Sequence, residues 1–356
     1  MAFSEKVKMS RKDNIRILLH MVRHRQITAK RIFNTIRNCY AYYIKKDITP
    51  KGYPCILMVE PTNVCNLKCP LCPTGAGTLT RPKAFMSFDN FKKVIDEIGD
   101  YLFNTTLYAF GEPFMNKDIY KIIEYAKSKR IFVRVSTNGH FFKGEGDIER
   151  LIKSQLDDLV ISFDGASQET YVQYRRMGDF NLVIDNLKKI VKMKKELKSN
   201  LPYIEMQFIV MGHNEHEVEK MEQLAKDIGV DKLTLKSVLV DEVSNLSDQE
   251  KAQYLPKNPK FRRYSDTKNW VNRDKVDIHH CIRVWLSSLI MSNGSVVPCC
   301  YDYNATYTFG NAFTEKFMDI WGNKKYQNFR AQILEDKRQF GMCKNCTGKL
   351  LNTALD

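Results

Sequence analysis

The sequence lacks any apolar run approaching the roughly 20 residues that a membrane-spanning helix needs. It also lacks an N-terminal apolar segment followed by a small-residue cleavage site, the pattern of a secretory signal peptide. We therefore expect a soluble, cytoplasmic protein, with peripheral membrane attachment left open. RNA-binding motifs and a platform of interleaved basic and aromatic residues are also missing, which disfavours nucleic-acid binding.

The composition suits a globular protein, because 43% of the 356 residues are hydrophobic and 27% are charged. There are ten cysteines. In a reducing cytosol, clustered cysteines are more typical of metal or redox sites than of disulfides. The thiols are therefore interpreted as ligands.

Positive charge is concentrated at the N-terminus of a chain whose net charge is +15. Residues 1–52 hold 13 lysines and arginines against three acidic residues, and apolar residues such as Ile32, Phe33, Ile36 and Tyr40 recur at near-helical intervals. Basic amphipathic helices of this kind can bind anionic lipid or an acidic partner. The interpretation we favour is simpler: a solvated basic face whose apolar stripe packs on the main domain.

Beyond residue 52, strand-like and helix-like segments alternate six times, which predicts a parallel α/β sheet built by right-handed crossovers. In such a sheet the functional loops lie at the carboxyl ends of the strands. The expected strands are 56–60, 105–110, 132–136, 159–163, 204–210 and 232–235. The expected helices are 87–99, 116–129, 146–156, 179–197 and 215–229.

Three cysteines, Cys65, Cys69 and Cys72, follow the first expected strand with CxxxCxxC spacing, and Pro70 and Pro73 stiffen their loop. A structural zinc site usually has four protein ligands, and no fourth cysteine or histidine is nearby. Three thiolates suit a [4Fe–4S] cluster with one open iron. A structural metal is the alternative.

The segment VEPTNVCNLKCPLC resembles the core motif of radical S-adenosylmethionine (SAM) enzymes. The resemblance implies an α/β fold, a partial (β/α)6 TIM barrel of the radical SAM type with a small C-terminal α+β auxiliary-cluster domain. It also implies reductive cleavage of SAM to a 5′-deoxyadenosyl radical that abstracts a substrate hydrogen. Flavodoxin or ferredoxin would donate the electron.

The same resemblance implies SAM contacts at successive strand ends. FGEP resembles the family's GGEP segment, with a phenylalanine in place of the first glycine, and its backbone and acidic residue would hold the SAM amino group. The guanidinium of Arg175 suits the SAM carboxylate, with Arg176 an equal candidate. The implied SAM-binding residues are Gly111, Glu112, Ser136, Asn138, Ser162, Asp164 and Arg175.

The C-terminal region holds two pairs of cysteines, Cys281 with Cys299 and Cys343 with Cys346. The Asn293-Gly294 turn predicts a hairpin that brings the first pair together. Four thiolates could bind zinc. The spacing resembles the SPASM or shorter twitch domain, which implies one fully ligated auxiliary [4Fe–4S] cluster, so that the cofactors would be SAM and two [4Fe–4S] clusters.

The other three cysteines are not expected to be ligands. Cys300 adjoins Cys299 and should point elsewhere, whereas Cys39 and Cys55 have no paired spacing and are interpreted as structural.

The expected organisation is a basic helical arm (1–52), a radical SAM core (53–240), a connector (241–280) and an auxiliary-cluster domain (281–356). A single auxiliary cluster resembles the superfamily's dehydrogenases, which implies an oxidoreductase acting on a sugar or cyclitol alcohol. Peptide modification by maturation, cross-linking or epimerisation is the alternative. A metal-stabilised protein that binds nucleic acid or membrane through the basic arm is the alternative of another class.

Overall fold

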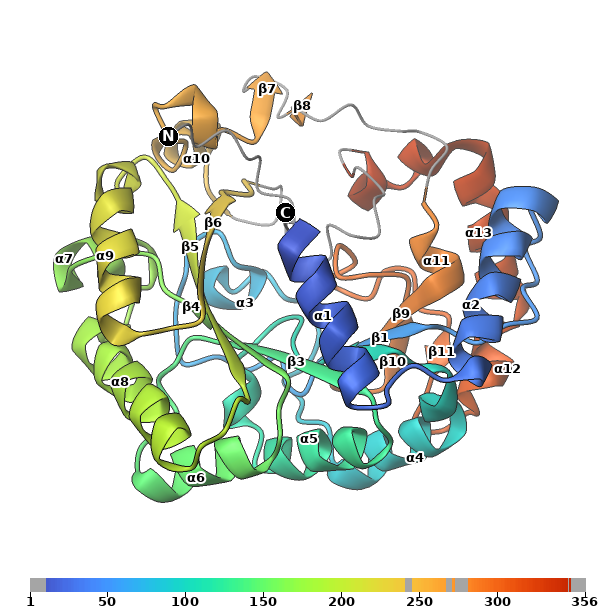
Figure 1. Ribbon diagram of the computed structural model, residues 1–356. Helices are drawn as coiled ribbons and strands as arrows, with labels where there is room; N and C mark the ends of the chain where they lie inside the picture. Colours follow the sequence, from blue (N-terminus) through green and yellow to red (C-terminus); the bar gives the residue numbers. More distant parts are fainter. Residues whose placement is uncertain (1–10, 241–244, 267–270, 273–280, 345, 347–356) are drawn as a thin grey trace.

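The computed structural model describes residues 11–240, 245–266, 271–272, 281–344 and 346 (Figure 1). Parts of the expected arm, connector and auxiliary domain therefore lie outside the described residues. The helices are α1 (Arg11–Arg23), α2 (Ala29–Tyr40), α3 (Pro73–Ala76), α4 (Phe88–Ile98), α5 (Ile119–Ser128), α6 (Glu145–Lys153), α7 (Gln168–Tyr174), α8 (Phe180–Glu196), α9 (Val218–Ile228), α10 (Asp248–Gln253), α11 (Arg283–Leu286), α12 (Phe317–Trp321) and α13 (Lys324–Asp336). None of the described helices is long and apolar enough to cross a membrane.

One nine-stranded sheet organises the molecule, in the order β11-β10-β9-β1-β2-β3-β4-β5-β6. All six expected strands are present and pair in parallel, so the predicted partial barrel is confirmed. The sheet does not close, since β6 and β11 are its two edges. Its strands are β1 (Ile56–Val59), β2 (Asn104–Thr106), β3 (Phe132–Thr137), β4 (Asp158–Ser162), β5 (Tyr203–Val210), β6 (Lys232–Ser237), β9 (Ser287–Ile290), β10 (Ser295–Val297) and β11 (Gly310–Asn311). A separate two-stranded sheet consists of β7 (Tyr264–Asp266) and β8 (Val271–Asn272).

Helices α4, α5, α6, α8 and α9 cover the outer face of the parallel strands (Figure 1). Local chemistry fixes several helix starts: the side chains of Ser87, Ser167 and Asp179 accept hydrogen bonds from backbone N–H groups in the first turns of α4, α7 and α8. Alternate strand residues such as Val133 and Val135 pack against these helices in the main core. The intervening strand residues face the barrel interior.

The C-terminal region extends the barrel sheet. Strand β9 pairs in parallel with β1, and β10 returns antiparallel to β9. This confirms the predicted hairpin, whose turn places Gly294 at φ +90°, a conformation that favours glycine. Cys299, just after β10, is therefore carried by the same sheet that carries the first cysteine loop.

The N-terminal arm docks with its polar face inward, so our expectation that its apolar stripe packs on the main domain is wrong. Arg31 is 2% exposed and donates hydrogen bonds to four backbone carbonyls, among them those of Gly99 and Lys129. Asn34 and Asn38 are also buried, and both donate to the carbonyl of Tyr53. Buried polar groups need such partners, and here backbone carbonyls at helix and strand ends supply them.

Candidate functional site

The first three cysteines lie in the loop between β1 and α3, at the carboxyl end of β1. Cys72 is the N-cap of α3, and its N–H donates to the carbonyl of Cys69 at 3.2 Å. All three belong to a small cluster with Leu67 and Tyr174. The loop therefore places the three thiols among apolar side chains.

The chemistry of these thiols suits binding to a cation. Burial raises the pKa of Cys65 to about 11 and that of Cys69 to about 12, and the neighbouring thiols push both in the same direction. Bound iron would stabilise the thiolates and offset that cost. Among the described residues, no three His, Cys, Asp or Glu side chains already stand in a metal-binding arrangement, so the ligand assignment stays a prediction.

The loop after β2 packs tightly on the cysteine loop. Gly111 has φ +75°, and a Cβ there would lie 2.4 Å from the carbonyl oxygen of Thr62, so only glycine fits. The N–H of Glu112 donates to the carbonyl of Val64 at 2.8 Å. This segment, interpreted from the sequence as the SAM amino-group site, thus borders the cysteines.

Glu112 also braces the end of β3. Its carboxylate accepts hydrogen bonds from the Thr137 hydroxyl at 2.6 Å, the Asn138 N–H at 2.8 Å and the Phe114 N–H at 3.1 Å. Burial raises the pKa of Glu112 to about 7, although these donors favour the charged form. The side chain of Asn138 in turn donates to Asn66 at 2.7 Å, within the cysteine loop.

The hydroxyls of Ser136 and Ser162 lie 3.5 Å apart on adjacent strands and face the barrel interior. They lie on the same inward faces of β3 and β4 as Arg134 and Asp158, nearer the carboxyl ends of those strands. Both predicted serines therefore lie in the barrel interior, between the cysteine loop at the carboxyl ends of the strands and the charged residues nearer the amino ends.

Asp164 and Arg175 form a buried ion pair, with Arg175 Nε 2.6 Å from Asp164 Oδ2. Asp164 is fully buried and also accepts from the N–H of Ile209. Arg175 Nη1 lies 3.7 Å from the Sγ of Cys69, whereas Arg176 is exposed. Position thus favours Arg175 over Arg176 as a ligand of an anion held beside the cysteines.

We expect Arg175→Lys to weaken SAM binding by about tenfold or more, because lysine cannot make a forked contact to a carboxylate while paired with Asp164. The matched control is Arg176→Lys, which changes an adjacent exposed arginine and should leave the SAM dissociation constant unchanged. Equilibrium dialysis of SAM against the reconstituted variants measures both. Equal loss in the two variants would contradict the assignment.

The C-terminal cysteines also converge. Burial raises the pKa of Cys281, Cys299 and Cys343, and the electrostatic influence of other thiols in the group raises each further. Arg283, on α11, is 8% exposed and lies close enough for these thiols to raise its own pKa against the effect of burial. Two of the four thiols, Cys281 and Cys343, are buried, and a set of four thiols suits a cluster or zinc.

Cys300 was expected to point away from this group. It nevertheless lies close enough to Arg283 and Cys346 for both to affect the pKa of its thiol. Its side chain also packs in a separate apolar cluster with Met58 and Leu289. Its assignment as a spare thiol stays a prediction.

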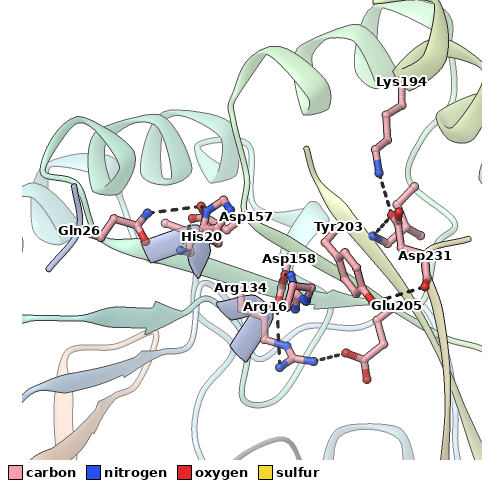
Figure 2. Close-up of polar contacts among 12 residues, drawn as sticks. Arg16, His20, Gln26, Arg134, Asp157, Asp158, Lys194, Tyr203, Glu205 and Asp231 are labelled. Carbon is pink, nitrogen blue, oxygen red and sulfur yellow. Dashed lines mark hydrogen bonds and ion pairs between the residues drawn. The ribbon is translucent and has the colours of Figure 1, made fainter. Parts of the chain in front are cut away.

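A charged network at the amino ends of the barrel strands was not anticipated from the sequence (Figure 2). Arg16, from α1, donates to both carboxylate oxygens of Asp158 at 3.1 and 3.2 Å and lies 3.6 Å from the ring centre of Tyr203. Arg134 pairs with Glu205 at 2.5 Å and lies 4.0 Å from Asp158. Helix α1 thereby covers the barrel floor.

The neighbouring Asp157 completes the attachment of α1. It is 1% exposed and contacts His20 at 2.5 Å and Lys127 at 2.5 Å. The segment LDDLVIS contained the only sequence cue, two acidic residues opening an otherwise apolar strand. The sequence gives no cue to the cations that pair with these two carboxylates. Two of the cations lie on α1, more than 100 residues earlier, and the others lie on α5 and β3.

Sequence analysis also missed a buried ion pair beside the cysteine loop. Glu60 is fully buried and binds Arg81 through two hydrogen bonds of 2.9 and 2.8 Å. Ser292, after β9, donates to Glu60 through its N–H and hydroxyl. Arg81 Nε reaches the carbonyl of Tyr303 at 2.7 Å. This network ties the cysteine loop to the C-terminal region.

Comparison with known proteins identifies the family. Residues 59–228 match the model of the Radical SAM superfamily, and residues 281–347 match that of SPASM, an iron–sulfur cluster-binding domain. The chain belongs to the radical SAM superfamily and carries a C-terminal SPASM domain. Its cofactors are accordingly SAM and two [4Fe–4S] clusters.

Curated relatives have different activities. The chain is 26% identical over 320 residues to the antilisterial bacteriocin subtilosin biosynthesis protein AlbA of Bacillus subtilis, covering 83% of this chain and 67% of AlbA. It is 29% identical over 177 residues to the AdoMet-dependent heme synthase of Methanosarcina barkeri, about half of each protein (49% and 48%). These similarities support a radical SAM enzyme without specifying the substrate.

Solved structures share the fold. SuiB of Streptococcus suis bound to S-adenosylmethionine matches with a TM-score of 0.63 and 15% identity, covering 97% of this chain and 85% of SuiB. BtrN in complex with AdoMet and 2-DOIA matches with a TM-score of 0.50 and 17% identity, covering 83% and 93%.

Proposed function

We propose that this radical SAM enzyme oxidises a secondary alcohol of a small polar substrate, such as a sugar or cyclitol. The observation that carries the proposal is the polar interior of the barrel. Arg134 and Ser136 on β3, Asp158 and Ser162 on β4, and Glu205 on β5 occupy inward positions. The charged side chains pair with one another and with Arg16, which makes this interior polar, and a substrate rich in hydroxyl groups suits such an interior better than an apolar one.

The proposed organisation is the one expected from the sequence, with a radical SAM core over 53–240 and an auxiliary-cluster domain over 281–356. Cys65, Cys69 and Cys72 would hold the cluster that binds SAM. The auxiliary cluster would be held by Cys281, Cys299, Cys343 and Cys346. The residues proposed to contact SAM are Gly111, Glu112, Ser136, Asn138, Ser162, Asp164 and Arg175.

When bound, SAM and the clusters supply a hydrogen-atom abstractor and an electron acceptor; the protein supplies position and enclosure. Gly111 allows the β2 loop to approach the cysteine loop, and Glu112 holds the ends of β2 and β3 together. Arg16 closes the opposite end of the barrel over Asp158. Enclosure matters because water and adventitious donors would quench a reactive radical.

Peptide modification is the second candidate, favoured by the comparisons. AlbA is a bacteriocin biosynthesis protein that aligns with 83% of the chain, and SuiB has also been solved bound to its precursor peptide SuiA. A peptide substrate would approach from the carboxyl ends of the strands, because α1 covers their amino ends.

Isotope transfer distinguishes the two candidates. The anaerobically reconstituted enzyme, reduced by flavodoxin or dithionite, is incubated with SAM and polyols deuterated at their carbinol carbons. We expect deuterium in 5′-deoxyadenosine, and a ketone product in an amount equal to that of the deuterated 5′-deoxyadenosine. Deuterium transfer only from α- or side-chain-labelled peptides would support the second candidate instead. SAM cleavage without transfer from either substrate class would contradict both.

A further inference from the structure

The N-terminal arm exposes an unusual amount of apolar surface. Of the 14 large hydrophobic side chains that are exposed in the described part of the chain, ten lie between Ile15 and Ile44. Contiguous exposed apolar patches on soluble proteins commonly mark interaction sites. The ten are Ile15, Leu18, Leu19, Val22, Ile32, Phe33, Ile36, Tyr40, Tyr43 and Ile44.

The spacing of these residues gives each helix one apolar face. On α1 the exposed residues from Ile15 to Val22 follow i, i+3, i+4, i+7 spacing, while Arg16 and His20 attach the other side to the barrel floor. On α2 the exposed residues include Phe33 at 66% and Ile36 at 57%. Neither apolar face is covered by other described residues.

The contacts of the buried face maintain this exposure. Rotating α2 to bury Phe33 would remove the Arg31 guanidinium from three carbonyls of the main domain and the Asn34 and Asn38 amides from the Tyr53 carbonyl. Each carbonyl left unsatisfied would destabilise the rotated arrangement. The contacts that dock the arm on the main domain therefore keep its apolar face exposed.

Positive charge surrounds the apolar faces. Exposed cations on the arm include Arg23, Arg25, Arg37, Lys45 and Lys46. A hollow of about 620 Å³ in the arm is lined by Arg37, Tyr40, Ala41, Lys45, Asp47 and Lys51. Three cations against the single carboxylate of Asp47 leave the hollow positively charged, which suits the phosphate of a lipid headgroup.

We propose that α1, α2 and the π-helical segment that follows (Ala41–Lys45) form a docking surface for a membrane containing anionic phospholipids. The apolar faces would enter the headgroup boundary while the surrounding cations contact phosphate. A second copy of this chain fits less well, because pairing the faces would bring two sets of cations together. The arm would lie on the membrane, since none of the described helices is able to cross it.

Vesicle binding of the full-length reconstituted protein tests the proposal. We expect co-sedimentation with phosphatidylcholine vesicles containing phosphatidylglycerol, and much less with phosphatidylcholine alone. Raising the salt to 1 M should weaken binding, because the screening length falls from about 8 to about 3 Å. Binding that ignores both lipid charge and salt would overturn the proposal.

Paired variants locate the surface. Phe33→Glu/Ile36→Glu should lower the partition coefficient by at least about tenfold, because two apolar side chains no longer enter the membrane. The matched control, Leu182→Glu/Leu197→Glu, changes two exposed leucines at the ends of α8 and should bind as the unchanged protein does. Equal binding by the two double variants would overturn the proposal.

Charge variants and oligomeric state complete the test. Arg37→Gln/Lys45→Gln should weaken vesicle binding, whereas Lys188→Gln/Lys189→Gln on α8 should not. SAM cleavage and thermal unfolding should be unchanged in all four double variants, which separates docking from folding and from the proposed reaction. The proposal would be overturned in favour of a second copy as the partner if the protein binds no vesicles and light scattering shows a dimer that Phe33→Glu dissociates.

Discussion

The variant Cys69→Ala, reconstituted under anaerobic conditions, will form no 5′-deoxyadenosine above the background of protein-free mixtures. Cys69 is 5% exposed, lies beside Arg175, and is the middle cysteine of the proposed cluster loop. Two thiolates cannot hold a cubane that normally requires at least three. Bound iron should therefore fall from about eight to about four atoms per chain. Iron and sulfide analysis with chromatography of the nucleoside product measures both effects.

Two other cysteine variants separate this effect from general damage. Cys39→Ala removes a half-buried thiol of α2 and should retain both the iron and the activity. The double variant Cys343→Ala/Cys346→Ala also leaves only two thiolates, at the auxiliary site, and should lose about four irons but still cleave SAM, because that site is distinct. If the unchanged protein instead binds about four irons and one zinc, the C-terminal thiols hold zinc. SAM cleavage by Cys69→Ala at the unchanged rate would refute the ligand assignment.

The variant Arg81→Ala will lower the free energy of unfolding by about 3–5 kcal/mol, the usual cost of breaking a buried ion pair. Glu60 is fully buried and would keep only the Ser292 donors for its charge. Arg81 also supplies a hydrogen bond to the carbonyl of Tyr303. The loss should appear in urea unfolding and as a lower midpoint of thermal unfolding.

An exposed ion pair provides the control for this variant. Lys153→Ala removes a pair with Glu149 in which the Lys153 side chain is 66% exposed, so we expect a change below about 1 kcal/mol. The double variant Glu60→Gln/Arg81→Met removes both charges but keeps an acceptor for Ser292, and should recover more than half of the lost stability. No difference between Arg81→Ala and Lys153→Ala would show that the buried pair contributes nothing.

Local patterns were sufficient to predict the framework. Alternating strand and helix segments anticipated all six parallel strands, although β2 is shorter than expected and ends at Thr106. The Asn293-Gly294 dipeptide anticipated the β9–β10 hairpin because its geometry depends on the turn residues themselves. The cysteine spacings and the radical SAM resemblance anticipated the family that the domain matches identify.

The arm was predicted incorrectly because hydrophobic periodicity indicates that a helix is amphipathic and leaves open which face will be buried. Arg31 and Asn38 could be placed on the inner face only after backbone carbonyls from distant segments were known to meet them.

The sequence by itself determined the alternation of strands and helices, the spacing of the two cysteine groups and the positions of the loops that carry them, because these depend on neighbouring residues. Only the tertiary structure decided that Arg16 would cover the barrel floor, that Glu60 and Arg81 would join the cysteine loop to the C-terminal region, and that the apolar faces of the arm would remain exposed. These arrangements depend on which distant groups satisfy a buried charge or carbonyl, and that choice is made only when the chain is packed.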